Sequence, residues 1–254
     1  MSDPVLEVAD LSVTFGGVKA LAGVTFSLRD GELQGLIGPN GAGKTTVMRS
    51  ITGVVQPNRG IIRLDGRDLG AMPTHMRIRA GLGLSQQLTR PFRSMTALDN
   101  VAFAAGLERT RRPLRAMFAR DRSAEREEAL RLLRLVGIED AAERMPGVMP
   151  LGYLKRLEMA RAMALKPRLL LLDEPLAGLN HGEAAQLADT IVTLNGRGLS
   201  ILLIEHNLGE VARVCSRLVV LDNGRVLADG QTDAVLGDNA VRDAYLGRGR
   251  HAAA

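Results

Sequence analysis

The chain has 254 residues, of which 46 % are hydrophobic and 24 % charged, a balance ordinary for a soluble globular protein. Its 33 Lys and Arg against 28 Asp and Glu give a formal net charge of +5, while the absence of Trp and an aromatic share of 3 % argue against the base-stacking surfaces of single-strand nucleic-acid binders. No apolar run approaches the length of about 18 residues that spans a bilayer, and the first residues lack the pattern of a signal peptide. The single cysteine, Cys215, is typical of a protein in a reducing compartment.

The first predicted elements are short strands joined by glycine turns. Residues 5–8 and 11–15 alternate apolar and polar side chains, Gly16-Gly17 is typical of a turn, and residues 24–28 resume the alternation before Asp30-Gly31. This pattern predicts a small antiparallel sheet near the N-terminus.

A different pattern follows, in which continuous apolar runs alternate with helical spacing. Residues 33–37 form a compact apolar run, Gly38 opens a glycine-rich loop, and residues 44–51 have helical spacing. Further apolar runs at 169–172, 200–204 and 218–221 are separated by helical patterns, notably 183–194. Buried parallel strands with crossover helices have this pattern, so we predict an α/β core.

Strand patterns disappear between about Gln87 and Lys166. Residues 96–107, 123–136 and 154–165 have helical spacing, and the middle segment places Glu127 and Arg131 at i,i+4 and ends at Gly137, a candidate C-cap. We interpret this region as a helical insertion. We therefore predict one domain over 1–254, in which 1–86 and 167–254 form the catalytic core and 87–166 a helical subdomain.

The loop Gly38-Pro39-Asn40-Gly41-Ala42-Gly43-Lys44-Thr45 matches the phosphate-loop pattern in full. Its glycines let backbone N–H groups turn toward a phosphate without Cβ clashes, and the following helix presents its positive end. Lys44 is expected to reach the β- and γ-phosphates and the Thr45 hydroxyl to bind Mg²⁺. A glycine turn can match by chance, but the preceding strand and following helix favour binding of ATP and Mg²⁺.

A second motif places two carboxylates at the end of an apolar run. Because open α/β sheets bind ligands at the carboxyl ends of their strands, Asp173 is expected to hold Mg²⁺ and Glu174 to act as general base toward the attacking water. His206 follows the next apolar run. A lone His is usually structural, but this position would let it contact the γ-phosphate and sense hydrolysis.

Together these motifs resemble the nucleotide-binding subunits of ATP-binding cassette (ABC) transporters over nearly the full chain. The resemblance implies a P-loop NTPase (RecA-like) core with an N-terminal antiparallel β subdomain and an inserted α-helical subdomain. It implies an ATPase, converting ATP and water to ADP and phosphate, in which two cassettes enclose two ATP molecules and move transmembrane permease subunits. Such a subunit is cytoplasmic and peripheral on the inner face of the plasma membrane, through those permease subunits.

The resemblance also assigns roles beyond the two motifs. Phe15 lies where an aromatic side chain stacks on adenine, with Val18 close by, and Gln87 lies in the loop that couples Mg²⁺ to the permease, whose coupling helices would dock near Phe92 and Met95. The candidate catalytic residues are Glu174, His206 and Lys44. The candidate nucleotide-binding residues are Phe15, Val18, Asn40, Gly41, Ala42, Gly43, Lys44, Thr45, Thr46, Gln87 and Asp173, and the candidate metal ligands are Thr45, Gln87 and Asp173.

Finer segments look like the branched-chain amino acid importer branch of the family. They are residues 92–100, 174–180 and 204–207 and the ending Ala244-Tyr245-Leu246-Gly247. The long segment between Gly106 and Ala124 favours the larger of that system's two ATPase subunits, with a solute-binding protein as an indirect partner. The lipopolysaccharide-export ATPase is a close relative, and importers of urea or amides share the tail.

One segment departs from the family pattern. The signature Leu-Ser-Gly-Gly-Gln, which reaches across the dimer to the partner's γ-phosphate, reads Met149-Pro150-Leu151-Gly152-Tyr153 here. Pro150 offers neither a hydroxyl nor an N–H, and each hydrogen bond lost to a charged group costs about 1.5–3 kcal/mol. Asn180 also replaces the usual Asp of the dimer loop.

Because the chain's own ATP motifs are intact, we predict an asymmetric heterodimer with a second ATPase subunit that supplies a normal signature. The alternatives are a branch whose geometry compensates for the change, and a homodimer in isolation.

Two rival functions fit less of the sequence. Nucleic-acid-associated ABC ATPases carry a long coiled coil between the two ATP motifs, or two cassettes in one chain, and neither is present. A P-loop small-molecule kinase would explain Lys44 and Asp173, but not the helical insertion, Gln87 or His206. A non-catalytic binding protein does not account for Glu174. No nucleic-acid partner is expected.

Overall fold

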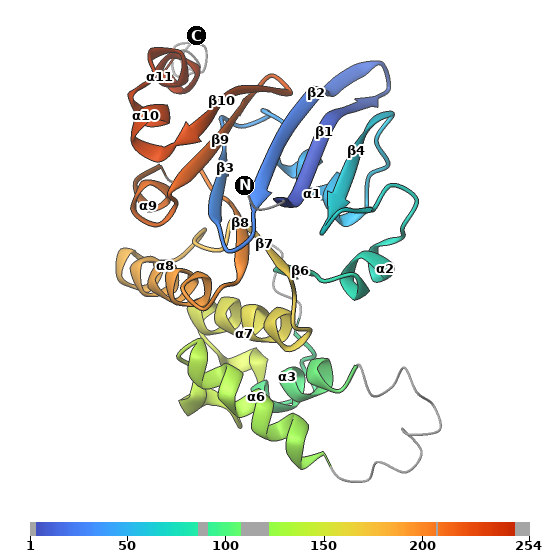
Figure 1. Ribbon diagram of the computed structural model, residues 1–254. Helices are drawn as coiled ribbons and strands as arrows, with labels where there is room; N and C mark the ends of the chain where they lie inside the picture. Colours follow the sequence, from blue (N-terminus) through green and yellow to red (C-terminus); the bar gives the residue numbers. More distant parts are fainter. Residues whose placement is uncertain (1–3, 86–90, 108–121, 207, 247–254) are drawn as a thin grey trace.

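The computed structural model describes residues 4–85, 91–107, 122–206 and 208–246, and Figure 1 shows two sheets above a group of helices. The first sheet has the order β2-β1-β4-β5. Its strands are β1 Pro4–Phe15, β2 Val18–Arg29, β4 Arg59–Leu64 and β5 Arg67–Asp68. All pairings in it are antiparallel, which confirms the predicted N-terminal sheet.

β1 and β2 are longer than the alternation predicted. The register of β1 against β2 shifts between Val8 and Leu11, and Asp10 between them has a φ of 51°. A β-bulge inserts a residue and so interrupts the period of two without ending the strand. The two alternating runs at 5–8 and 11–15 therefore belong to one strand.

The second sheet has the order β10-β9-β3-β8-β7-β6. All its pairings are parallel except that of β10 with β9. The strands are β3 Leu33–Ile37, β6 Leu82–Ser85, β7 Leu169–Asp173, β8 Ser200–Ile204, β9 Arg217–Asp222 and β10 Arg225–Gln231. Every residue of β3, β7 and β8 is buried, which explains their continuous apolar runs.

Alternate residues of these strands enter two different cores. Leu169 and Leu171 pack with the first sheet and with helix α1, Lys44–Thr52, whereas Leu170 and Leu172 pack with helix α8, His181–Asn195, and with the helical part of the chain. Figure 1 shows these layers on the two sides of the parallel sheet. The remaining helices beside the core are α2 Thr74–Arg79, α9 Leu208–Val214, α10 Thr232–Gly237 and α11 Asn239–Leu246.

The helical part consists of α3 Ala97–Ala105, α6 Ser123–Leu135 and α7 Leu151–Ala164, with short 3₁₀ turns at Glu139–Ala141 and Pro146–Val148. These helices pack on one another below the sheet in Figure 1. Gly137 ends α6 with a φ of 74°, as expected of a C-cap. The division of the chain at residues 87 and 166 remains our proposal.

Two details of the helical part differ from prediction. Arg131 pairs with Glu128 at 2.7 Å rather than with Glu127, because residues three apart are also neighbours on a helix and Glu128 presents both carboxylate oxygens. Helix α7 starts at Leu151, three residues earlier than its apolar spacing indicated. No helix within the described ranges is long and apolar enough to cross a membrane.

Candidate functional site

The glycine loop connects the end of β3 to the start of α1, and two of its glycines are required by space. A Cβ on Gly38, which has a φ of 149°, would lie 2.2 Å from the Leu221 carbonyl oxygen. A Cβ on Gly43, which has a φ of 107°, would lie 2.7 Å from Leu21 Cδ2. Because both contacts are too short for carbon and both φ values are strained for a residue with a Cβ, glycine is required at these two positions.

Lys44 begins α1 and is buried. Its Nζ donates to the carbonyl oxygens of Gly38, at 2.7 Å, and Pro39, at 3.2 Å. Burial lowers the pKa of Lys44, while the carboxylates of Glu174 and Asp173 raise it. The ammonium thus lies at the N-terminal end of α1, where unpaired N–H groups and the helix dipole also attract an anion.

A pocket of ≈ 210 Å³ opens over this loop. Eight candidate residues from the sequence line it together, namely Asn40, Gly41, Ala42, Gly43, Lys44, Thr45, Thr46 and Glu174. Ala20 of β2 also lines it and was not singled out from the sequence, because a small apolar residue in a strand has no functional signal. Backbone amides, a cation and two hydroxyl residues on one polar pocket suit a polyphosphate.

Asp173 and Glu174 lie where β7 ends, beside this pocket. Asp173 is buried, and burial followed by the charge of Glu174 raises its carboxyl pKa, while Arg49 and Lys44 lower it. A buried carboxylate whose pKa is raised gains stability when a cation arrives. Thr45 on the pocket wall offers a hydroxyl oxygen.

These oxygens fit Mg²⁺. In the described ranges no three His, Cys, Asp or Glu side chains cluster as metal ligands, but Mg²⁺ needs only one or two protein carboxylates beside phosphate and water oxygens. Asp173 and Thr45 are the residues that would hold it. Gln87, the third candidate ligand, lies outside the residues that the structure describes.

His206 and Glu205 follow β8, next to Glu174. His206 Nδ1 lies 3.9 Å from Glu174 Oε1 and 3.8 Å from Glu205 Oε2. The Glu205 carboxylate is buried and accepts hydrogen bonds from the N–H groups of Leu176, at 2.8 Å, and His206, at 3.3 Å. Its role as an anchor of both segments was missed from the sequence, although a carboxylate continuing an apolar strand was a visible signal.

Phe15 and Val18 face one another across the β1–β2 turn and are exposed. Neither belongs to the lining of the phosphate pocket. An exposed aromatic side chain is what adenine stacking requires, so their assignment remains a prediction.

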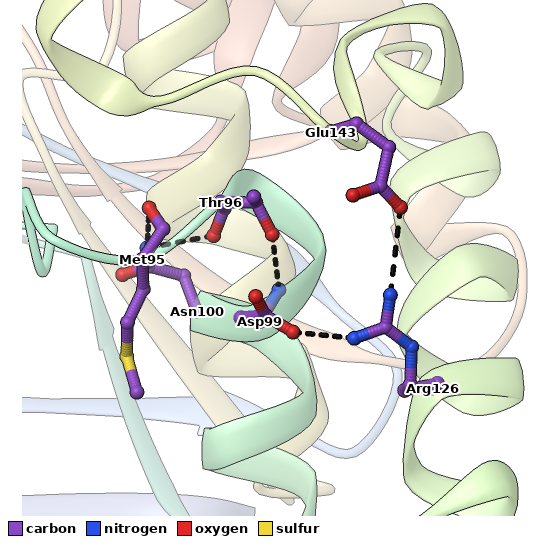
Figure 2. A network of polar contacts seen from close by, with 6 residues as sticks. All are labelled: Met95, Thr96, Asp99, Asn100, Arg126 and Glu143. Atoms are coloured by element: carbon purple, nitrogen blue, oxygen red, sulfur yellow. Dashed lines mark hydrogen bonds and ion pairs between the residues drawn. The ribbon is translucent and has the colours of Figure 1, made fainter.

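The loop before α3 is organised by one buried side chain (Figure 2). Asn100 accepts a hydrogen bond from the Phe92 N–H at 2.8 Å, and its Nδ2 donates to the carbonyls of Phe92, Met95 and Thr96 at 2.9–3.2 Å. Thr96 caps α3 by accepting the Asp99 N–H. Asp99 in turn pairs with Arg126 of α6 at 2.6 Å, so that the loop is fixed to two helices.

This loop presents an exposed aromatic surface. Phe92 and Phe103 are exposed, and their rings meet edge to face with centroids 5.4 Å apart. The Arg161 guanidinium lies 5.0 Å from the centroid of the Phe92 ring. Exposed apolar groups held rigidly in this way are typical of a protein-docking surface.

The altered signature segment lies at the start of α7. Pro150 is the N-cap residue, and α7 has no side-chain cap. Val148 and Leu151 beside it are exposed. Asn180, in the expected dimer loop, caps α8 instead: its side chain accepts the Glu183 N–H at 2.9 Å, and Glu183 accepts the Asn180 N–H at 3.1 Å.

The parallel sheet, the glycine loop opening a helix and the acidic strand end define a P-loop nucleoside triphosphatase. A family model described as "ABC transporter" matches residues 21–177. The chain belongs to this family, and it is an ATP-binding ABC ATPase that works with a transporter complex.

Relatives of two transport systems are similar to the chain over most of its length. The high-affinity branched-chain amino acid transport ATP-binding protein BraF of Pseudomonas aeruginosa is 38 % identical over 258 residues, covering 97 % of this chain and 99 % of BraF. The lipopolysaccharide export system ATP-binding protein LptB of Acidithiobacillus ferridurans is 39 % identical over 225 residues, covering 88 % of this chain and 89 % of LptB.

A solved structure has the same fold. The ADP conformation of MJ1267, an ATP-binding cassette of an ABC transporter, superposes with a TM-score of 0.84 at 27 % identity and covers 97 % of this chain and all of MJ1267 (100 %). This similarity confirms the predicted fold class.

Proposed function

We propose that the chain powers an importer of branched-chain or related amino acids by hydrolysing ATP. The observation that carries this choice is identity at full length: BraF is 38 % identical over 97 % of the chain and 99 % of BraF, whereas the LptB of Haemophilus influenzae covers 96 % of the chain at 31 % identity. Since the specificity of such a system lies in its membrane and solute-binding subunits, the proposal concerns which complex this subunit serves. Lipopolysaccharide export is the second candidate, because LptB reaches 39 % identity over a shorter range.

The proposed chemistry uses the groups around the phosphate pocket. Lys44 and the loop amides bind the β- and γ-phosphates, and Phe15, with Val18, stacks on adenine. Asp173 and Thr45 would hold Mg²⁺, with Gln87 as the further ligand expected from the resemblance, and the ion would neutralise phosphate charge when bound. Glu174 orients water and takes its proton as the water oxygen attacks the γ-phosphorus and the bond to ADP breaks. His206, beside Glu174, contacts the γ-phosphate.

The proposed roles of Lys44 and Glu174 can be tested by measuring nucleotide binding and ATPase activity in variants. Lys44→Ala should abolish binding of a fluorescent ATP analogue, whereas the matched change Lys166→Ala, at an exposed lysine, should leave its Kd unchanged. Glu174→Gln should retain binding and lose ATPase activity. Full ATPase activity in Lys44→Ala would refute the site.

The proposed partners are transmembrane permease subunits, which place this chain on the cytoplasmic face of the membrane. Their coupling helices would dock on the loop held by Asn100, where Phe92 is exposed and Met95 is half-buried. Co-expression with permease and solute-binding subunits from neighbouring genes, followed by uptake of labelled leucine into vesicles, tests the importer. Uptake of no amino acid, with ATPase stimulated by lipopolysaccharide instead, would favour the second candidate.

We also propose a second, different ATPase subunit as the dimer partner. The altered segment at Pro150 would complete the partner's site, while the intact Lys44, Asp173 and Glu174 would use the partner's signature. Mixed complexes carrying Glu174→Gln in this chain, or the equivalent change in the partner, should lose turnover unequally. Equal losses would contradict the asymmetry.

A further inference from the structure

The backbone of Glu174 adopts an uncommon conformation that its neighbours must hold. Its φ of 47° lies in the left-handed region, which non-glycine residues occupy only when surrounding contacts impose it. The N–H of Glu174 donates to the Ile204 carbonyl at 2.8 Å. This bond to β8 fixes the peptide that precedes Glu174, and in the peptide that follows it the Glu174 carbonyl accepts the Ala177 N–H at 3.2 Å.

Lys155 provides a side-chain contact to the same carbonyl oxygen, and this contact comes from helix α7. Lys155 lies one turn beyond Leu151 on α7, it is 6 % exposed, and its Nζ donates to the Glu174 carbonyl oxygen at 3.0 Å. The amine therefore joins a helix of the helical part to the backbone of the residue expected to activate water. The surroundings are acidic, since Glu205 and Glu174 both raise the pKa of Lys155 against the larger lowering by burial.

Glu205 holds the same segment two residues further along the chain. Its carboxylate accepts the Leu176 N–H, two residues after Glu174, and is buried. The segment 174–176 is thus held by one buried cation and one buried anion that attract each other. Burying each of these charges costs desolvation free energy, and the hydrogen bonds to the backbone of residues 174 and 176 offset part of that cost.

We propose that Lys155 is a positioning residue for Glu174, setting the direction of its carboxylate through the hydrogen bond to its carbonyl oxygen. This inference rests on the proposed role of Glu174 as general base. Because α7 begins at the altered signature segment, the bond also connects the part of the chain facing the partner's ATP to this chain's own water-activating group.

The test compares three variants in the complete transporter complex. Lys155→Met keeps the length of the side chain and removes its charge and donor, Lys155→Arg keeps both, and Lys166→Met is the matched control at an exposed lysine. Lys155→Met should lower kcat about 10- to 100-fold, as expected when a reacting group is misplaced, with KM and the Kd for ATP within about threefold of wild type. Lys155→Arg should recover most of kcat.

A double variant separates positioning from general damage. If Lys155 acts through Glu174, adding Lys155→Met to Glu174→Gln should not lower the residual rate further. A multiplied loss in the double variant, or wild-type kcat in a folded Lys155→Met, would overturn the inference. If Lys155→Met does not fold, failure of Lys155→Arg to retain kcat with normal ATP binding would overturn it. Unchanged ATPase activity in Glu174→Gln itself would instead refute the proposed function.

Discussion

Arg77 of α2 is predicted to hold the phosphate-loop helix in place from its far end. The side chain is fully buried, and its guanidinium donates to the carbonyl oxygens of Ser50 at 2.6 Å, Ile51 at 2.8 Å, Met72 at 2.8 Å and Gly70 at 3.3 Å. Ser50 and Ile51 belong to the last turn of α1, which begins at Lys44. A cation at this end of a helix also complements the helix dipole.

Substituting Arg77→Met fills the space but removes every donor. The Ser50 carbonyl still accepts the Gly53 N–H at 3.2 Å, so the carbonyls of Ile51, Met72 and Gly70 bear most of the loss, at about 1–3 kcal/mol for each buried acceptor. The charge no longer has to be desolvated, which offsets part of this. Three acceptors left unpaired would cost about 3–9 kcal/mol, and the relief of desolvation reduces this to an expected net loss of about 3–5 kcal/mol, a large share of the roughly 5–15 kcal/mol that stabilises a domain.

Thermal unfolding followed by circular dichroism measures this loss. At about 2–4 °C per kcal/mol for a chain of this size, the Tm should fall by about 6–20 °C. Arg79→Met, an exposed position on the same helix, is the control and should change Tm by less than about 2 °C. The Kd for an ATP analogue should rise in Arg77→Met and stay unchanged in Arg79→Met. A Tm equal to that of the control would refute the reasoning.

Three further predictions concern other parts of the site. Gly38→Ala should abolish binding of a fluorescent ATP analogue, because its Cβ would lie 2.2 Å from the Leu221 carbonyl oxygen; a wild-type Kd would contradict this. Asn100→Leu should cost about 2–4 kcal/mol by leaving polar groups of the loop at 92–96 unpaired, and hydrogen exchange should accelerate there but not at the phosphate loop. Asp173→Asn should raise the Tm of the nucleotide-free protein at pH 7.5. Burial raises the carboxyl pKa of Asp173 in the folded state, so ionisation destabilises the fold above that pKa, and the advantage of the variant should shrink as the pH falls through it. An advantage that grew in acid would contradict the sign.

The core could be predicted because its signals are local. The runs 169–173 and 200–204 are apolar at every position but their ends and are buried on both faces, and the glycine loop between strand and helix has one structural meaning. The C-cap at Gly137 could also be predicted, because it depends only on residues adjacent to it in the sequence. Elements with a continuous or periodic pattern of apolar residues can therefore be predicted from the sequence alone.

The contacts that orient the site could not be predicted because they join distant residues. Lys155 and Arg77 are cations on helices, a pattern that normally indicates exposure, and only the folded backbone brings an acceptor within reach of each. Glu205 was visible as a carboxylate beside His206, but its partner Leu176 lies 29 residues away. Side-chain to backbone bonds of this kind leave no periodic pattern in the sequence.

The geometry of α7 allows an estimate of how much the two ATP sites of the predicted heterodimer differ in turnover. Read as sequence, Pro150 suggested the loss of both a hydroxyl and an N–H donor. Pro150 is the N-cap, and α7 begins at Leu151, so the N–H groups from Leu151 onward remain available to an anion and the loss is confined to the hydroxyl and the N–H of residue 150. Each hydrogen bond to a charged group contributes about 1.5–3 kcal/mol, which corresponds to about 10- to 150-fold in rate. The two sites of the mixed complex should therefore differ in turnover by at least about 10-fold. Equal turnover would mean that neither of these two donors contributes to hydrolysis.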